Sequence, residues 1–178
     1  MGYKNTSSTK MSQNIREMVQ IALMAAITYI SVSYLHIPYG VGGVVHLGDS
    51  IIFVTAILFG ARQAAISGAI GMTLFDIFFY PTYAPYTFFI KAGMGLIAGL
   101  IARSGNSQGN KITRNIIGIV LAGVLGVVGY YIAEVIMYSN FYTPLGYVLG
   151  NIIQVTAGGI IAMVLLPALK RTRYFGNS

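Results

Sequence analysis

Residues 115–138 read NIIGIVLAGVLGVVGYYIAEVIMY, an apolar run in which Glu134 is the one charged residue. A helix that crosses the hydrocarbon core of a bilayer needs about 20 consecutive, mainly apolar residues. A helix on the surface of a soluble protein carries a polar face instead. The run therefore predicts a membrane-spanning helix.

The composition of the whole chain agrees with this prediction. Of the 178 residues, 56% are hydrophobic and 8% are charged, and the mean hydropathy is +0.72. A soluble domain has roughly 25% charged residues, so these charges are too few to cover a water-soluble globule. The chain has no cysteine and two histidines, which excludes disulfides and cysteine metal sites and makes a histidine-rich metal site unexpected. We expect no metal and no cofactor.

Five further apolar stretches accompany residues 115–138, and together they predict an all-α bundle of six transmembrane helices spanning residues 17–171. The first stretch is interpreted as a retained helix, since no small-residue cleavage site follows a short apolar core. Residues 1–16 and 172–178 are predicted to be cytoplasmic. The five stretches are 18–34, 47–60, 62–80, 86–102 and 144–169.

The basic residues give the six helices a direction. With six spans and a cytoplasmic N-terminus, ten of the eleven Lys and Arg residues fall on one side of the membrane. Short loops rich in Lys and Arg stay in the cytoplasm. The net charge of +7 is therefore interpreted as topology and contact with anionic lipid, not as nucleic-acid binding. The ten are Lys4, Lys10, Arg16, Arg62, Arg103, Lys111, Arg114, Lys170, Arg171 and Arg173.

The remaining charged residues lie at one depth. Lys91, Glu134, Asp49 and Asp76 come from four predicted helices, roughly 5 to 8 Å below their outer ends at 1.5 Å per residue. Charges inside a bilayer usually face one another or a watery cavity. We therefore predict a binding site in this layer, suited to a neutral or zwitterionic heteroaromatic solute. Its other candidate residues are Asn151, Gln154, Tyr86, Tyr131, Tyr138 and His46.

The sequence also allows a purely structural explanation for these charged residues. Lys91 could pair with Glu134 or Asp76 simply to hold the bundle together. Asp49 could merely cap the helix that follows it, and His46 could be a solvated residue of the outer loop 35–46. Two further outer loops, 80–85 and 139–143, lack Lys and Arg and are rich in Tyr and Pro.

The inner half of the predicted bundle carries no chain of charges. A proton-coupled carrier usually needs a titratable relay near the midplane. Its absence favours a capture subunit that takes its energy from a partner. No Ser/His/Asp set, HExxH motif or P-loop is present, so we expect no enzyme.

Four features resemble the substrate-binding S components of energy-coupling factor (ECF) transporters, which are prokaryotic vitamin importers. They are the six spans with both ends inside, Ala22-x-x-x-Ala26, the segment HLGDSIIFVTAILFGAR at 46–62, and the Tyr-rich stretch leading into FFIKAGMGLIAG at 88–99. The last two resemble the riboflavin-type branch, which includes pyridoxine and hydroxymethylpyrimidine carriers.

The resemblance implies a location in the prokaryotic plasma membrane and three partners, a transmembrane coupling protein and two cytoplasmic ATPases. It implies that Ala22 and Ala26 contact the coupling protein. It also implies a ligand near the outer face, among the first outer loop and the last three helices, covered by that loop and the loop before residue 86.

Three functions remain possible from the sequence. The first is the vitamin-binding subunit of an ATP-driven importer, with pyridoxine or hydroxymethylpyrimidine favoured and riboflavin next. The second is a self-sufficient secondary transporter or small channel. The third is a structural membrane protein whose buried charges only pair.

Overall fold

The computed structural model describes residues 6–39 and 43–171. The predicted tail 172–178, the first five residues and the centre of the first outer loop lie outside the described residues. Helices are α1 (Thr6–Tyr34), α2 (Gly48–Leu58), α3 (Ala61–Phe79), α4 (Ala84–Ala102), α5 (Ile112–Tyr138) and α6 (Leu145–Lys170). Between α1 and α2 lie strands β1 (His36–Tyr39) and β2 (Gly43–His46), and a short 3₁₀ turn, η1 (Gly105–Ser107), follows α4.

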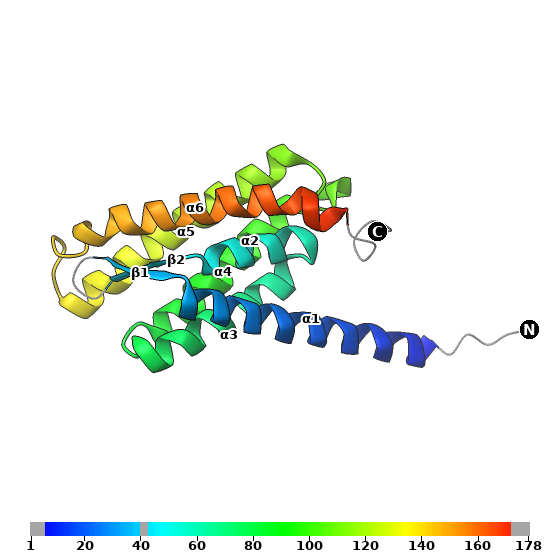
Figure 1. The fold of residues 1–178 in the computed structure, drawn as a ribbon, viewed down its shortest axis with the longest axis horizontal. Helices are drawn as coiled ribbons and strands as arrows, with labels where there is room; N and C mark the ends of the chain where they lie inside the picture. The colour runs from blue at the N-terminus through cyan, green and yellow to red at the C-terminus, as the bar shows by residue number, and fades with distance from the viewer. Residues whose placement is uncertain (1–5, 40–42, 172–178) are drawn as a thin grey trace, which may run out of the picture.

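The helices run back and forth along one axis, so that α1 begins and α6 ends at the same end of the bundle (Figure 1). The β1–β2 hairpin and the connections α3–α4 and α5–α6 lie toward the opposite end. We call this opposite end the hairpin end. The fold is mostly helical, as the sequence predicts.

Four helices are long and apolar enough to cross a membrane, counted over the described residues: α1 from Lys10, α4, α5 and α6. Large apolar side chains cover much of their outer surface, as with Val124 and Ile160, which are 55% and 60% exposed. Lipid replaces water as the solvent for such a surface.

The first helix begins at Thr6, twelve residues before the predicted start at Met18. The predicted start followed hydropathy, so it marks the apolar span, and the helix itself begins before that span. Lys, Gln, Arg and Glu are good helix formers, so the polar segment continues the same helix beyond the apolar part. Arg62 at the start of α3 pairs with Glu17 of this segment, with 3.1 Å between Nη1 and Oε1.

The short helix α2 lies inside the bundle. Its 11 residues extend about 16 Å, half the roughly 30 Å hydrocarbon core. Nine of them are buried, including both polar and apolar positions from Gly48 to Ile57. A helix that is buried on all sides packs against several neighbours, and α2 contacts α3, α4 and α6.

Close packing of α3 against α4 depends on small residues. A Cβ on Gly99 would lie 2.4 Å from the Ala61 backbone, and one on Gly95 would lie 2.6 Å from that of Ala64. Small residues four apart permit this approach in membrane helices. Gly158 of α6 similarly faces Asp49 at the start of α2, where a Cβ would lie 3.1 Å from the Asp49 Cβ.

A two-stranded hairpin replaces the irregular first outer loop. β1 pairs antiparallel with β2, His36 opposite His46 and Ile37 opposite Val45. The all-α prediction was wrong for this segment. A two-stranded hairpin is marginal by itself, and the contacts of β2 with α6 support it here.

Candidate ligand site at the hairpin end

A buried ion pair joins α2 and α4. Lys91 Nζ donates to Asp49 Oδ1 at 2.6 Å, and the two side chains are 1% and 0% exposed. The alternative in which Lys91 pairs with Glu134 or Asp76 is therefore wrong. α2 lies beside α4 in the bundle, which brings the Asp49 carboxylate to the Lys91 ammonium.

Asp49 does not cap α2. Leu47 is the N-cap residue, and no side chain in the described part of the chain forms an N-cap hydrogen bond there. The second carboxylate oxygen of Asp49 instead accepts a hydrogen bond from Gln154 Nε2 at 3.0 Å. Its place in the first turn still puts the negative charge at the favourable end of the helix dipole.

Gln154 connects this ion pair to the hairpin. Its side-chain oxygen accepts a hydrogen bond from the backbone N–H of His46 at 3.2 Å. One polar network therefore joins β2, α6, α2 and α4. A buried polar group without a partner destabilises the fold, so these hydrogen bonds favour the one arrangement of the four elements in which each group is paired.

His46 is buried, with 8% of its surface exposed, so the interpretation as a solvated loop residue is wrong. It lies close enough to Asp49 and Lys91 to interact with their charges. Burial lowers the pKa of His46 to about 4, which leaves its imidazole neutral at pH 7. A neutral imidazole offers one donor and one acceptor.

Within residues 6–39 and 43–171, three buried polar atoms around this network find no hydrogen-bond partner. They are His46 Nδ1, Glu134 Oε2 and Asn151 Nδ2. Glu134 is 3% exposed, on α5, while Asn151 is half-buried, one turn before Gln154 on α6. A buried polar atom without a partner costs about 1–3 kcal/mol, so three near one network need an explanation.

Tyr130 lies beside this network, although the sequence interpretation missed it. The Lys91 ammonium lies 5.1 Å from the centre of its ring, and its hydroxyl hydrogen-bonds with Thr87 at 3.1 Å. The hydroxyl also lies near the carboxyl groups of Asp49, Asp76 and Glu134. Spacing could have found it, because residues 130 and 134 share a helix face.

The other predicted tyrosines occupy different positions. The Tyr138 hydroxyl contacts that of Tyr83 at 3.4 Å, and its ring stacks on Tyr147 at 6.1 Å between centroids. The Tyr131 hydroxyl donates to the Phe141 carbonyl oxygen at 3.1 Å near the surface. Tyrosines from α4, α5 and α6 and from the α3–α4 connection thus line the hairpin end.

Two of the predicted site residues lie at the edge of the polar network. Tyr86 is half-buried against the apolar core of the bundle. Asp76 is half-buried on α3 and lies within hydrogen-bonding reach of Thr87. Thr87 therefore lies next to both Asp76 and Tyr130, so the layer of polar groups extends from α3 to Gln154 of α6.

A family described as "ECF-type riboflavin transporter, S component" matches residues 12–171. The chain belongs to the ECF S-component family. It is the substrate-binding membrane subunit of a vitamin transporter and not an enzyme.

The chain is 28% identical over 164 residues to the thiamine precursor transporter HmpT of Lactococcus lactis subsp. cremoris, covering 90% of this chain and 92% of that one. It is 32% identical over 135 residues to an uncharacterised protein of Pyrococcus woesei, covering 72% and 84%. A solved S component of a bacterial ECF transporter shares the fold, with a TM-score of 0.72, 18% identity and coverage of 93% and 99%.

Proposed function

We propose that this S component captures a small single-ring vitamin or vitamin precursor at the hairpin end. Hydroxymethylpyrimidine or pyridoxine is the leading substrate class, and riboflavin is the second. The three unpartnered buried atoms of His46, Glu134 and Asn151 carry this proposal. A polar heterocycle that bonds to them removes the cost of leaving them unpaired.

The chemistry of the three atoms describes the ligand. Glu134 Oε2 accepts hydrogen bonds, Asn151 Nδ2 donates them, and the neutral imidazole of His46 does either. A ring with both an amino or hydroxyl donor and a ring-nitrogen acceptor matches this set. Tyr130 and Tyr138 supply aromatic faces for stacking.

The two named similarities favour different substrates. HmpT is named as a thiamine precursor transporter, and it aligns with most of this chain. The description of the matching family names riboflavin, whose ring system is larger than a single pyrimidine or pyridine ring. The Lys91–Asp49 ion pair and Gln154 are already bonded to one another, so few polar groups remain to bind a large ligand. This supports the single-ring class.

In the membrane, the hairpin end would face outward and the end with Arg103, Lys111 and Lys170 would face the cytoplasm. The distribution of Lys and Arg supports this orientation. Residues 17–171 would then form one domain that passes the prokaryotic plasma membrane six times, with the short α2 held inside the bundle.

The partners would be a transmembrane coupling protein and two cytoplasmic ATPases. Ala22 and Ala26 support a contact with the coupling protein, because both are exposed on α1 while Met24 and Ala25 between them are buried. A pair of exposed small residues four apart allows another helix to approach closely.

Mass spectrometry of small molecules released from the purified chain tests this function. We expect a pyrimidine or pyridine, or riboflavin under the second substrate assignment. Release of no heterocycle, even after growth with all three compounds, would contradict substrate capture. Concentrative uptake by the chain alone, abolished with the proton gradient, would instead identify a secondary transporter.

A further inference from the structure

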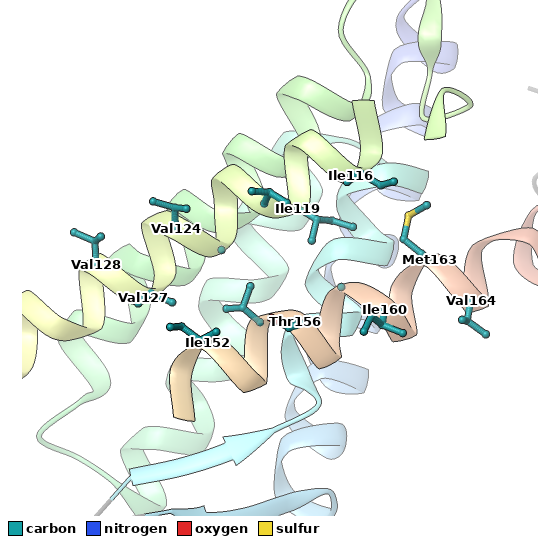
Figure 2. Close-up of a pocket in the computed structure, with 14 residues that line it drawn as sticks. Ile116, Ile119, Val124, Val127, Val128, Ile152, Thr156, Ile160, Met163 and Val164 are labelled. Carbon is teal, nitrogen blue, oxygen red and sulfur yellow. The ribbon is translucent and has the colours of Figure 1, made fainter. Parts of the chain in front are cut away.

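A long apolar groove runs between α5 and α6, separate from the polar site (Figure 2). Its volume is about 650 Å³, and Thr156 is the one lining residue with a polar side chain. In Figure 2, Val124 and Val128 of α5 and Ile152 and Ile160 of α6 lie along its two walls. Glu134, Asn151 and Gln154 do not line it.

The groove follows from the packing of the two helices. Two glycines face large side chains of the other helix. A Cβ on Gly123 of α5 would lie 2.3 Å from Val155 of α6, and a Cβ on Gly159 of α6 would lie 2.8 Å from Ile119 of α5. Val155 and Ile119 fill the space that a side chain at either glycine would need, so α5 and α6 are in close contact at these positions. On the open side, Val120 and Val164 are 54% and 70% exposed, so the groove opens to the surroundings of the bundle.

The length of the groove matches one leaflet of a bilayer. On α5 it extends from Ile116 to Val128, and on α6 from Ile152 to Val164, about 18 Å along each helix. A leaflet contributes about half of the roughly 30 Å hydrocarbon core. A single extended acyl chain fits this dimension, whereas the polar ligand of the proposed function does not fit an apolar wall.

One end of the groove meets a group of positive charges. Ile116 lies within two turns of Lys111 at the start of α5, and Val164 lies two turns before Lys170 and Arg171. Lys111 and Arg171 are exposed. No Asp or Glu occurs in residues 103–116 or 159–171, so no nearby acid on these segments neutralises the charges.

We propose that the α5–α6 groove binds one acyl chain of an anionic phospholipid whose phosphate lies against Lys111 and Arg171. Arg114 and Lys170 have backbone partners, because Arg114 donates to the Ser104 carbonyl and Lys170 donates to that of Gly109 at 2.5 Å. These bonds hold the α4–α5 connection at the end of α6. The phosphate would then lie between the start of α5 and the end of α6, and the acyl chain would lie in the groove between the two helices.

The chain has no tryptophan, which permits a direct test with a single introduced indole. Val120→Trp places it in the groove, and Leu96→Trp places it on the exposed surface of α4 as a control. Both variants are reconstituted in phosphatidylcholine vesicles that contain a small fraction of brominated-chain phosphatidylglycerol. We expect stronger quenching at residue 120, with brominated phosphatidylcholine giving equal quenching at both positions.

Removing the two exposed charges should remove the headgroup preference. Lys111→Gln combined with Arg171→Gln should lower the preference for phosphatidylglycerol by about fivefold for each charge removed. Native mass spectrometry of the chain without an introduced tryptophan measures the same quantity as phosphatidylglycerol adducts. Equal quenching at residues 96 and 120 would overturn the proposal, as would adducts that persist unchanged in the double variant.

Discussion

Loss of the buried ion pair gives the sharpest prediction about stability. Lys91→Met leaves the Asp49 carboxylate buried, with the Gln154 amide as its remaining bonded partner. Breaking a buried pair by removing one partner costs about 3–5 kcal/mol. In a protein of this size each kcal/mol shifts Tm by about 2–4 °C, so Tm should fall by roughly 6–20 °C.

The double variant separates pairing from packing. Asp49→Asn alone leaves the Lys91 ammonium unpaired and should lower Tm by a similar amount. Lys91→Met combined with Asp49→Asn removes both charges, and replacing a buried pair with neutral groups of similar volume is often neutral or stabilising. We therefore expect the double variant to regain most of the lost stability.

Thermal unfolding in detergent, followed by circular dichroism, measures these differences. Arg62→Gln is the control, since it breaks a pair in which Arg62 is 74% exposed and which contributes about 1 kcal/mol or less. If the losses of the two single variants add in the double variant, Lys91 and Asp49 act independently and the assigned pairing is wrong.

Two further predictions concern helix contacts. Gly99→Ala forces a Cβ to within 2.4 Å of the Ala61 backbone and should cost about 1–3 kcal/mol, whereas Gly146→Ala enters open space and should not lower Tm. Equal unfolding temperatures for the two variants would contradict the close α3–α4 packing. Ala22→Leu combined with Ala26→Leu should abolish uptake in cells that carry the coupling protein and ATPases, and it should preserve ligand binding. Loss of ligand binding would instead mean that these alanines pack inside the chain.

The sequence predicts the helices well because the apolar runs are long and bounded by Gly, Pro and basic residues. It does not predict the β1–β2 hairpin. β1 contains Pro38, which disfavours strands, and the hairpin depends on contacts with α6, including the bond between His46 and Gln154. Those residues lie 108 positions apart, so no local pattern contains the information.

For the site, helical rise alone placed Lys91, Asp49 and Glu134 at a common depth. It could not determine which of them pair, because pairing depends on which helices are neighbours. The structure places α2 against α4 and α6, so Asp49 meets Lys91 and Gln154, and Glu134 keeps an unpartnered oxygen. The sequence interpretation named Tyr131 as the candidate on this part of α5 and missed the neighbouring Tyr130.

The central claim is that the unpartnered atoms at the hairpin end bind the substrate. The binding affinity of a Glu134 variant tests this claim most directly. Isothermal titration of the purified chain with hydroxymethylpyrimidine, pyridoxine and riboflavin should show binding of one of them. Glu134→Gln replaces one acceptor oxygen with an NH2 donor and should weaken that binding by about 5- to 150-fold, the equivalent of about 1–3 kcal/mol for a buried polar group left without its partner. Glu17→Gln, outside the site, should bind normally. Equal affinity of the wild-type and Glu134→Gln chains, or no binding of any of the three compounds, would contradict the account.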